Sequence, residues 1–182
     1  MKKAIAKFLF ETVHGWEFVG KEPPKEVHRC MFVFAPHTSN WDFYLALGFM
    51  FSLGVKFTWM MKKEAFFWPV GPLWKRMGGI PIDRRAKTDV SGQVSDWIKN
   101  ADTVCLGITP EGTRTKVNRY KKGYLRIANS AEVPLFIVGL NAQTKEVVLD
   151  RIWPLTGDIK KDNAALKAYI DATFIGIHPE KA

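Results

Sequence analysis

Two short motifs in the sequence contain residues that could do chemistry. The first is His37-Thr-Ser-Asn-Trp-Asp42, a histidine and an aspartate separated by four residues. A histidine ring takes up and releases protons near neutral pH, and a carboxylate can fix its tautomer and stabilise the protonated ring. The motif therefore predicts a general base at His37 that is oriented by Asp42.

The same residues also fit a simpler structural interpretation. Ser39-x-x-Asp42 matches a helix capping box, with Ser39 as the N-cap and Asp42 in the first turn. In that interpretation His37 is an ordinary loop histidine. The two interpretations are compatible, because a helix start would hold Asp42 rigidly beside the ring.

The second motif is Pro110-Glu-Gly-Thr-Arg114, about seventy residues later. Gly112 allows the backbone to approach a ligand closely, and Arg114 could grip a phosphate with two parallel hydrogen bonds. Glu111 could position an acceptor or a backbone amide. Taken alone, the motif could also be a plain surface turn.

Together the two motifs favour transfer of an acyl group to a phosphorylated alcohol. The base would take the proton of the acceptor hydroxyl, and hydrogen-bond donors would stabilise the oxyanion that develops. If the donor is a thioester, the thiol leaves readily and no strong general acid is required.

A third stretch, Gly78-Gly-Ile-Pro-Ile-Asp-Arg84, ends another short predicted strand and offers Arg84 as a phosphate ligand. Taken alone, the charges at 83–85 would be a solvated cluster. Only its position between the other two motifs supports the interpretation of Arg84 as a phosphate ligand.

The elements that must position these residues alternate between strands and helices. The predicted strands cover residues 16–20, 29–35, 55–61, 79–83, 103–109, 134–140 and 146–153. The predicted helices cover residues 2–13, 41–53, 87–100, 121–131 and 163–174, with short helical pieces between 62 and 77. This alternation predicts a single α/β domain over residues 1–182, with a central, mostly parallel sheet flanked by helices. Both motifs directly follow strands, which places them at the carboxyl edge of that sheet.

Bulk composition limits the possible partners. The 182 residues are 47% hydrophobic and carry 27 Lys and Arg against 18 Asp and Glu, a net charge of +9. This charge predicts attraction to anions such as nucleic acid, anionic lipid or phosphorylated substrates. Cys30 and Cys105 are isolated in apolar runs, which indicates buried, reduced thiols and a cytoplasmic protein.

Several other classes are excluded by missing patterns. The longest charge-free run, residues 43–55, is too short to cross a bilayer. The sequence contains no zinc-ligand cluster, no Gly-x-Ser-x-Gly elbow and no His-Glu-x-x-His, and Glu22 stands where a P-loop needs Ser or Thr. We therefore expect no bound metal or cofactor.

The motifs in this order resemble the glycerolipid acyltransferase family, which includes 1-acylglycerol-3-phosphate acyltransferases, and most resemble a compact bacterial subgroup. The four blocks of that family resemble His37-x4-Asp42, Gly78 to Arg84, Glu111 to Arg114, and Val133-Pro134-Leu135. Lys62-Lys-Glu64 with Pro69 resembles the stretch that usually precedes the second block. The resemblance covers roughly residues 30–140.

The resemblance implies a glycerol-3-phosphate acyltransferase-like fold and direct acyl transfer from acyl-CoA or an acyl-carrier protein. It implies His37 as the base and Asp42 as its orienting residue. Around the acceptor it implies Arg84, Glu111, Gly112, Thr113 and Arg114, with Lys62 near the oxyanion site. The default acceptor is 1-acylglycerol-3-phosphate in phospholipid biosynthesis, and another lyso-lipid or an aminoacyl lipid stays open.

Two departures from the family pattern leave the acceptor open. The first block carries Asn40-Trp41 before Asp42, where many members have glycine or tyrosine followed by a small or apolar residue. In the fourth block, Ile137 stands where a second proline is usual.

Aromatic and basic residues suggest a membrane surface as a partner. Residues 2–13 predict a basic amphipathic helix, which could instead dock on its own domain. Between residues 56 and 77, Lys and Arg alternate with Phe57, Trp59, Phe66, Phe67, Trp68 and Trp74. We expect a peripheral enzyme on the inner face of the cell membrane that binds no nucleic acid, although single rings could equally be core residues. A basic, non-catalytic lipid- or nucleic-acid-binding module is the remote alternative.

Overall fold

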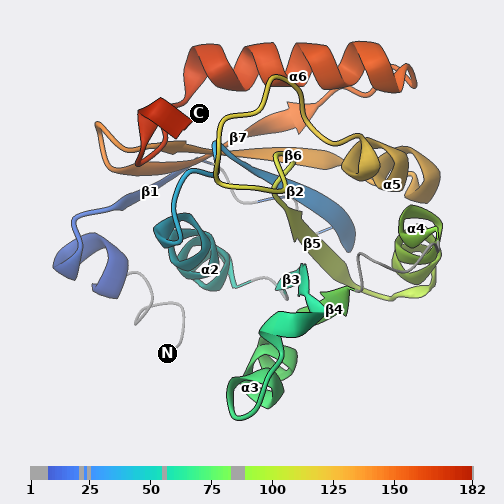
Figure 1. The fold of residues 1–182 in the computed structure, drawn as a ribbon, viewed down its shortest axis with the longest axis horizontal. Helices are drawn as coiled ribbons and strands as arrows, with labels where there is room; N and C mark the ends of the chain where they lie inside the picture. Colours follow the sequence, from blue (N-terminus) through green and yellow to red (C-terminus); the bar gives the residue numbers. More distant parts are fainter. Residues whose placement is uncertain (1–7, 21–22, 24–25, 55–56, 83–88, 182) are drawn as a thin grey trace.

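The strands observed in the structure form a single seven-stranded sheet. The computed structural model describes residues 8–20, 23, 26–54, 57–82 and 89–181. The strands are β1 (Glu17–Gly20), β2 (Arg29–Ala35), β3 (Phe57–Lys62), β4 (Gly79–Ile82), β5 (Val104–Ile108), β6 (Leu135–Asn141) and β7 (Glu146–Trp153). Their order is β1-β7-β6-β2-β5-β3-β4, and every neighbouring pair is parallel except β6 and β7 (Figure 1). The predicted α/β fold with a mostly parallel sheet is confirmed.

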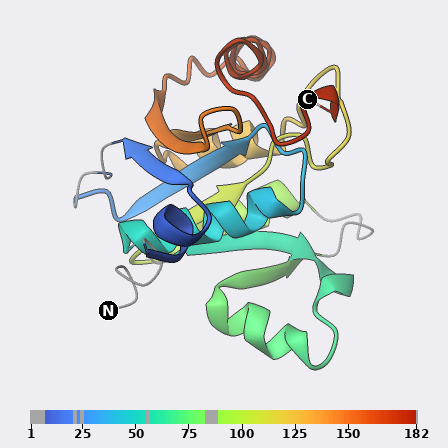
Figure 2. The ribbon, with the colours of Figure 1, turned by 90° about the vertical axis from the view of Figure 1, so that its left-hand side faces the viewer.

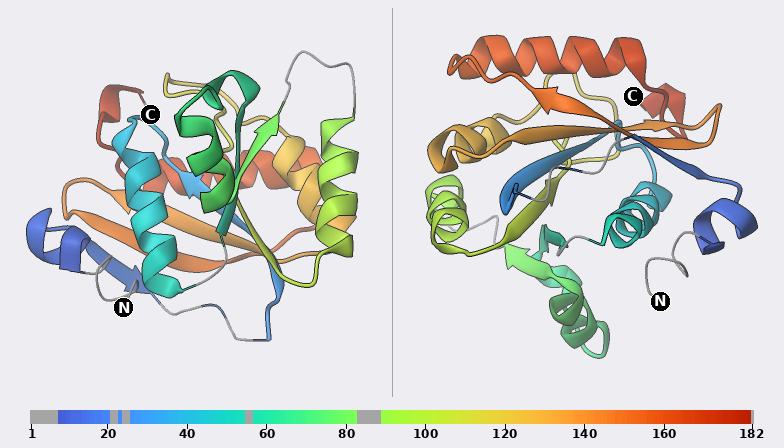
Figure 3. Two further views of the ribbon diagram at one scale, coloured as in Figure 1. Left: turned by 90° about the horizontal axis from the view of Figure 1, so that it is seen from below. Right: turned by 180° about the vertical axis from the view of Figure 1, so that it is seen from behind.

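Helices cover both faces of this sheet. The main helices are α2 (Trp41–Leu53), α3 (Val70–Met77), α4 (Val90–Asn100), α5 (Gly123–Ala131) and α6 (Ile159–Thr173). Short helical turns are η1 (Phe8–Val13), η2 (Lys63–Ala65) and η3 (Pro179–Lys181). Figures 1 and 3 show α6 and α5 on one side of the sheet and α2 on the other.

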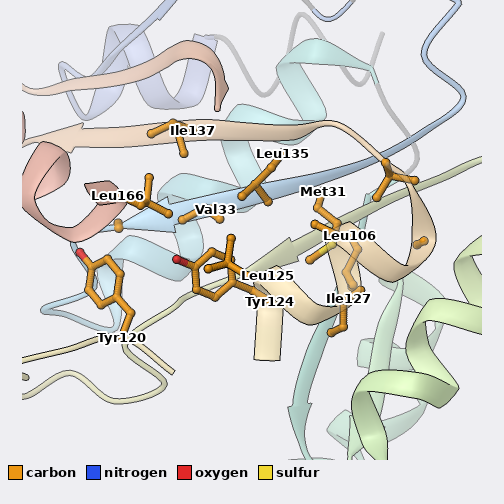
Figure 4. Packing of buried hydrophobic residues seen from close by; sticks show 14 of the residues in the cluster. Met31, Val33, Leu106, Tyr120, Tyr124, Leu125, Ile127, Leu135, Ile137 and Leu166 are labelled. Carbon is orange, nitrogen blue, oxygen red and sulfur yellow. The ribbon is translucent and has the colours of Figure 1, made fainter. Parts of the chain in front are cut away.

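The central strand β2 explains why both faces are covered. Side chains alternate along a strand, so Met31 and Val33 join the core beneath α4, α5 and α6, whereas Cys30 and Phe32 join the core beneath α2. A strand buried on both faces must be apolar throughout, as residues 30–35 are. Figure 4 shows the first of these cores, with Leu125 of α5 and Leu166 of α6 packed beside Val33.

Helix α2 begins and ends where the sequence predicts. It is apolar nearly all round because most of its length is buried, with Leu45, Phe49 and Met50 in the core. It ends at Gly54, whose φ of 72° is a left-handed conformation that glycine adopts without strain.

The bounds of two predicted helices differ most from those observed. The closing helix, predicted over 163–174, begins earlier at Ile159, because the Asp158 carboxylate accepts hydrogen bonds from the Lys160 and Lys161 amides and caps it. Of the helix predicted over 2–13, the described residues form only the short turn η1. The remainder, residues 2–7, lies outside the described residues.

The two cysteines lie side by side on neighbouring strands. Cys30 of β2 is in register with Cys105 of β5, and their sulfur atoms are 3.2 Å apart as two buried free thiols. The contact with Cys105, together with burial, raises the pKa of the Cys30 thiol.

The chain between β3 and β4 forms a lobe that projects from the rest of the molecule. We call residues 62–78, which include η2 and α3, the α3 lobe (Figure 2). No helix in the described part of the chain is long and apolar enough to cross a membrane.

Candidate active site

The two motifs leave the sheet side by side. Strands β2 and β5 are adjacent and parallel, with Val33 in register with Ile108. His37 follows the end of β2 by two residues, and Glu111 follows the end of β5 by three. Residues seventy positions apart in the sequence therefore meet at one edge, as the sequence predicts.

The His37 ring contacts the Asp42 carboxylate directly. His37 Nδ1 lies 3.1 Å from Asp42 Oδ2, and both side chains are mostly buried. A proton on Nδ1 would donate to the carboxylate and leave Nε2 unprotonated, ready to accept a proton. No described contact occupies Nε2.

The Asp42 carboxylate is held by the backbone of its own loop. Asp42 Oδ2 accepts hydrogen bonds from the Thr38 amide at 2.6 Å and from the Ser39 amide at 2.8 Å. Three donors thus meet at one oxygen and fix the carboxylate beside the ring.

The capping box differs from the predicted arrangement. The N-cap of α2 is Asn40, and Ser39 Oγ accepts from the Trp41 amide at 3.2 Å. Asp42 does reach back to the Ser39 amide, so the loop contains half of a capping box. The other half is missing, because Ser39 Oγ accepts from the Trp41 amide instead of the Asp42 amide.

Glu111 holds the loop of the first motif from the other side. Its Oε1 accepts a hydrogen bond from the His37 amide at 3.0 Å, and the residue is only 7% exposed. Burial raises the pKa of the carboxyl from 4.5 to about 7, against the lowering effect of its backbone hydrogen bonds. Of the two roles considered for Glu111, the structure shows the contact with a backbone amide.

The turn after Glu111 depends on glycine. Gly112 has a φ of 62°, and a Cβ built there would lie 2.7 Å from the Lys121 ammonium nitrogen. The Lys121 amide also donates to the Pro110 carbonyl at 2.9 Å, which closes the loop from 110 to 121. A second cation therefore lies over the turn, one that the sequence motif did not single out.

Arg114 is exposed and contacts the first motif. Its guanidinium donates to the Asn40 side-chain oxygen at the start of α2. Asn40, noted above as a departure from the family pattern, thereby links the two motifs. Thr113 lies next to Arg114, and its hydroxyl is 3.1 Å from that of Thr115.

Of the two remaining predicted residues, Lys62 lies farther along the same sheet edge. Lys62 ends β3 and is exposed, and no described contact joins it to the histidine or to the turn after β5. Arg84 lies outside the described residues, two positions beyond the end of β4 at Ile82. Because strands are about 4.8 Å apart, β4 lies roughly 14 Å from β2.

Residues from outside the two motifs complete the surroundings of His37. A shallow hollow beside His37, Thr38 and Glu111 is also lined by Tyr120, Lys167 and Lys181, the last two from α6 and η3. Figure 2 shows the red turn that contains Lys181 next to the yellow loop after β5. Sequence spacing gives no signal for these residues, because they come together only through the fold.

Comparisons with known proteins show the family and the fold of the chain. Residues 13–141 match the family model described as Acyltransferase. A solved structure of similar fold is that of the 1-acyl-sn-glycerophosphate (LPA) acyltransferase PlsC from Thermotoga maritima. The TM-score is 0.61 and the identity 20%, over 93% of this chain and 77% of that one, which shows a common fold. A comparison with curated proteins found no match.

Proposed function

The chain belongs to the acyltransferase family, and we propose that it transfers a fatty acyl group to the free hydroxyl of a phosphorylated lyso-lipid, with 1-acylglycerol-3-phosphate as the acceptor. The donor is a thioester, acyl-CoA or an acyl-carrier protein. The observation that carries the proposal is the His37–Asp42 pair, bound through the His37 amide to Glu111.

In the proposed reaction His37 is the general base. The acceptor oxygen attacks the thioester carbonyl carbon while its proton passes to His37 Nε2. Asp42 accepts from Nδ1–H and stabilises the imidazolium that forms. The C–S bond then breaks, the proton passes from the imidazolium to the departing thiolate, and the free thiol and the new ester are released.

Cations around the turn after β5 would bind the acceptor phosphate. Arg114 is exposed beside the start of α2, and Gly112 allows the backbone to approach a ligand. We assign Thr113 and Arg84 to the same role, and Lys62 to the oxyanion, from the family resemblance alone.

An acceptor panel tests the proposal. Free thiol is measured with acyl-CoA or acyl-carrier protein and with 1-acylglycerol-3-phosphate, another lyso-phospholipid or an aminoacyl lyso-lipid, and the products are identified by mass spectrometry. His37→Ala should abolish acceptor-dependent thiol release, and Asp42→Asn should cost several orders of magnitude. Rates close to wild type in either folded variant would refute the mechanism, and a preference for another acceptor would refute the substrate.

We further propose that the enzyme works at an anionic membrane surface, peripheral to the inner face of the cell membrane. The α3 lobe supports this proposal, because Phe67 and Trp68 at its tip are 63% and 84% exposed. The lobe carries four Lys and Arg against one Glu, all of them exposed. Exposed rings beside cations suit the boundary between lipid and water.

Fewer aromatic residues are exposed than the sequence suggested. Phe57 and Trp59 are buried in the core beneath α2, and Trp74 is half-buried against Phe43 of α2. Of the aromatic residues between 56 and 77, Phe67 and Trp68 are therefore the ones exposed to meet a bilayer.

Liposome flotation tests the membrane contact. Trp68→Ser should weaken binding to vesicles that contain anionic lipid by about tenfold or more, since burial of a large aromatic ring contributes roughly 1.5–3 kcal/mol. Trp97→Ser on α4 is a matched control, because Trp97 is 39% exposed and lies outside the lobe. Equal loss in both variants, or no loss in either, would contradict the assignment of the lobe.

A further inference from the structure

After α6 the chain returns to the sheet edge where His37 lies. The Ile175 amide donates to the Leu140 carbonyl at 3.1 Å, and the Ala142 amide donates to the Ile175 carbonyl at 2.7 Å. These bonds pair Ile175 with Asn141 in a parallel bridge at the carboxyl end of β6. Phe174 anchors the turn, since its ring fills the space where Gly139 of β6 has no side chain.

This returning segment then closes over Thr38. The His178 amide donates to Thr38 Oγ1 at 3.1 Å, and Thr38 is only 2% exposed. Gly176 passes so close that a Cβ built on it would lie 2.7 Å from Thr38 Oγ1 and 2.8 Å from Cγ2. Only glycine lets the backbone approach the threonine at this distance.

Thr38 is bound on its opposite side to the catalytic carboxylate. Its hydroxyl accepts from His178, while its amide donates to Asp42 Oδ2 at 2.6 Å. The same oxygen faces His37 Nδ1. A continuous path of hydrogen bonds therefore runs from the returning segment through Thr38 to the carboxylate and the base.

We propose that the segment Phe174–His178 is a positioning element for the catalytic pair and acts through Thr38. The proposal rests on the proposed roles of His37 and Asp42. The match to the family model ends at residue 141, so residues 174–178 lie outside the matched part of the chain. Hydrogen bonds weaken steeply when donor and acceptor are misaligned. If Thr38 could shift, its amide would no longer hold the Asp42 carboxylate in place.

Kinetics of variants at Thr38 and Gly176 test the proposal. Thr38→Val removes the hydroxyl, and kcat should fall about tenfold while both KM values stay within about twofold. Thr38→Ser keeps the hydroxyl and should restore kcat. Gly176→Ala should lower kcat similarly, whereas Gly123→Ala should not, because its new Cβ would lie 3.6 Å from the nearest atom, Ser91 Oγ.

A spectroscopic readout separates positioning from loss of fold. The ring nitrogens of His37 are observed by NMR in the ¹⁵N-histidine-labelled protein without substrate, with the His37→Gln variant giving the assignment. We expect one tautomer in wild type and in Thr38→Ser, and exchange between tautomers in Thr38→Val with its unfolding midpoint retained within error. An unchanged His37 signal or an unchanged kcat in folded Thr38→Val would overturn the proposal.

Failure of the proposed function would look different. If His37→Ala kept full activity, the proposed reaction would be wrong, yet the ring signal of His37 would still report whether residue 38 orients Asp42. The two proposals can therefore fail separately.

Discussion

The buried carboxyl of Glu111 should make the protein less stable as the pH rises, and Glu111→Gln should remove this effect. The pKa of Glu111 is raised to about 7 in the folded protein from 4.5, because burial disfavours the charged form. At about 1.36 kcal/mol for each pH unit, ionising this carboxyl in the folded protein costs about 3 kcal/mol more than ionising it in the unfolded chain.

The direction follows from the order in which the two states ionise. Below about pH 4.5 both states keep the proton on Glu111, and its contribution to stability is fully present. Between pH 4.5 and about 7 the folded protein holds a proton that the unfolded chain has released, so stability falls as the pH rises. Above pH 7 both states are charged and the loss is complete. Glutamine cannot ionise, and its oxygen can still accept from the His37 amide.

Urea unfolding at pH 5, 6, 7 and 8, followed by fluorescence of the seven tryptophans, measures the effect. Relative to wild type, Glu111→Gln should gain stability as the pH rises from 5 to 8, by most of that difference of about 3 kcal/mol. The exposed Glu26→Gln is the control, and its curve should follow that of wild type. Parallel curves for wild type and Glu111→Gln would refute the argument that this carboxyl is buried with a raised pKa.

Three further predictions concern other parts of the site and the core. Gly112→Ala should lower the free energy of unfolding by about 1–2 kcal/mol, because its φ of 62° disfavours a side chain; an unchanged urea midpoint would show that the turn relaxes. Arg114→Ala should raise the KM for a phosphorylated acceptor about tenfold and leave an uncharged acceptor unaffected, and equal losses on both would contradict a phosphate contact. Cys30 and Cys105 should react with an aromatic disulfide reagent only after unfolding, and rapid labelling of the native protein would contradict their burial.

The sheet and the meeting of the two motifs could be predicted from local patterns. Strand β2 is a run of apolar residues that Pro36 ends, and α2 is an apolar run that ends at Gly54. Parallel strands bring their carboxyl ends to one edge, so two motifs that each follow a strand had to lie at the same edge of the sheet. The placement of both motifs at one edge could therefore be predicted from strand and helix patterns alone.

The contacts that hold the site together could not be predicted in the same way. Thr38 and His178 are 140 positions apart, and no periodicity relates them. Asn40 and Arg114 were noted separately, one as a departure from a pattern and one as an expected phosphate ligand. Their contact depends on side-chain direction, which spacing alone does not give.

The aromatic residues show a signal that was present but not used. Phe57 and Trp59 are two residues apart on a strand, so they face the same side, and that side is the core beneath α2. Phe67 and Trp68 are adjacent and stand outside any strand or helix, where alternation cannot bury them. Strand alternation would therefore have separated the core rings from the exposed ones before the structure was known.

The site works as one unit because of the register between β2 and β5. With Val33 opposite Ile108, His37 and Glu111 leave the sheet at nearly the same level, and the Glu111 carboxyl can reach the His37 amide. A shift of one residue would move these groups by about 3.3 Å, well beyond a hydrogen bond, and would turn the apolar side chains of β2 to opposite faces. The two cores on either side of β2 therefore fix the register, and the register brings together His37, Asp42 and the turn after β5. The packing on both faces of β2 is therefore necessary for the geometry of the site.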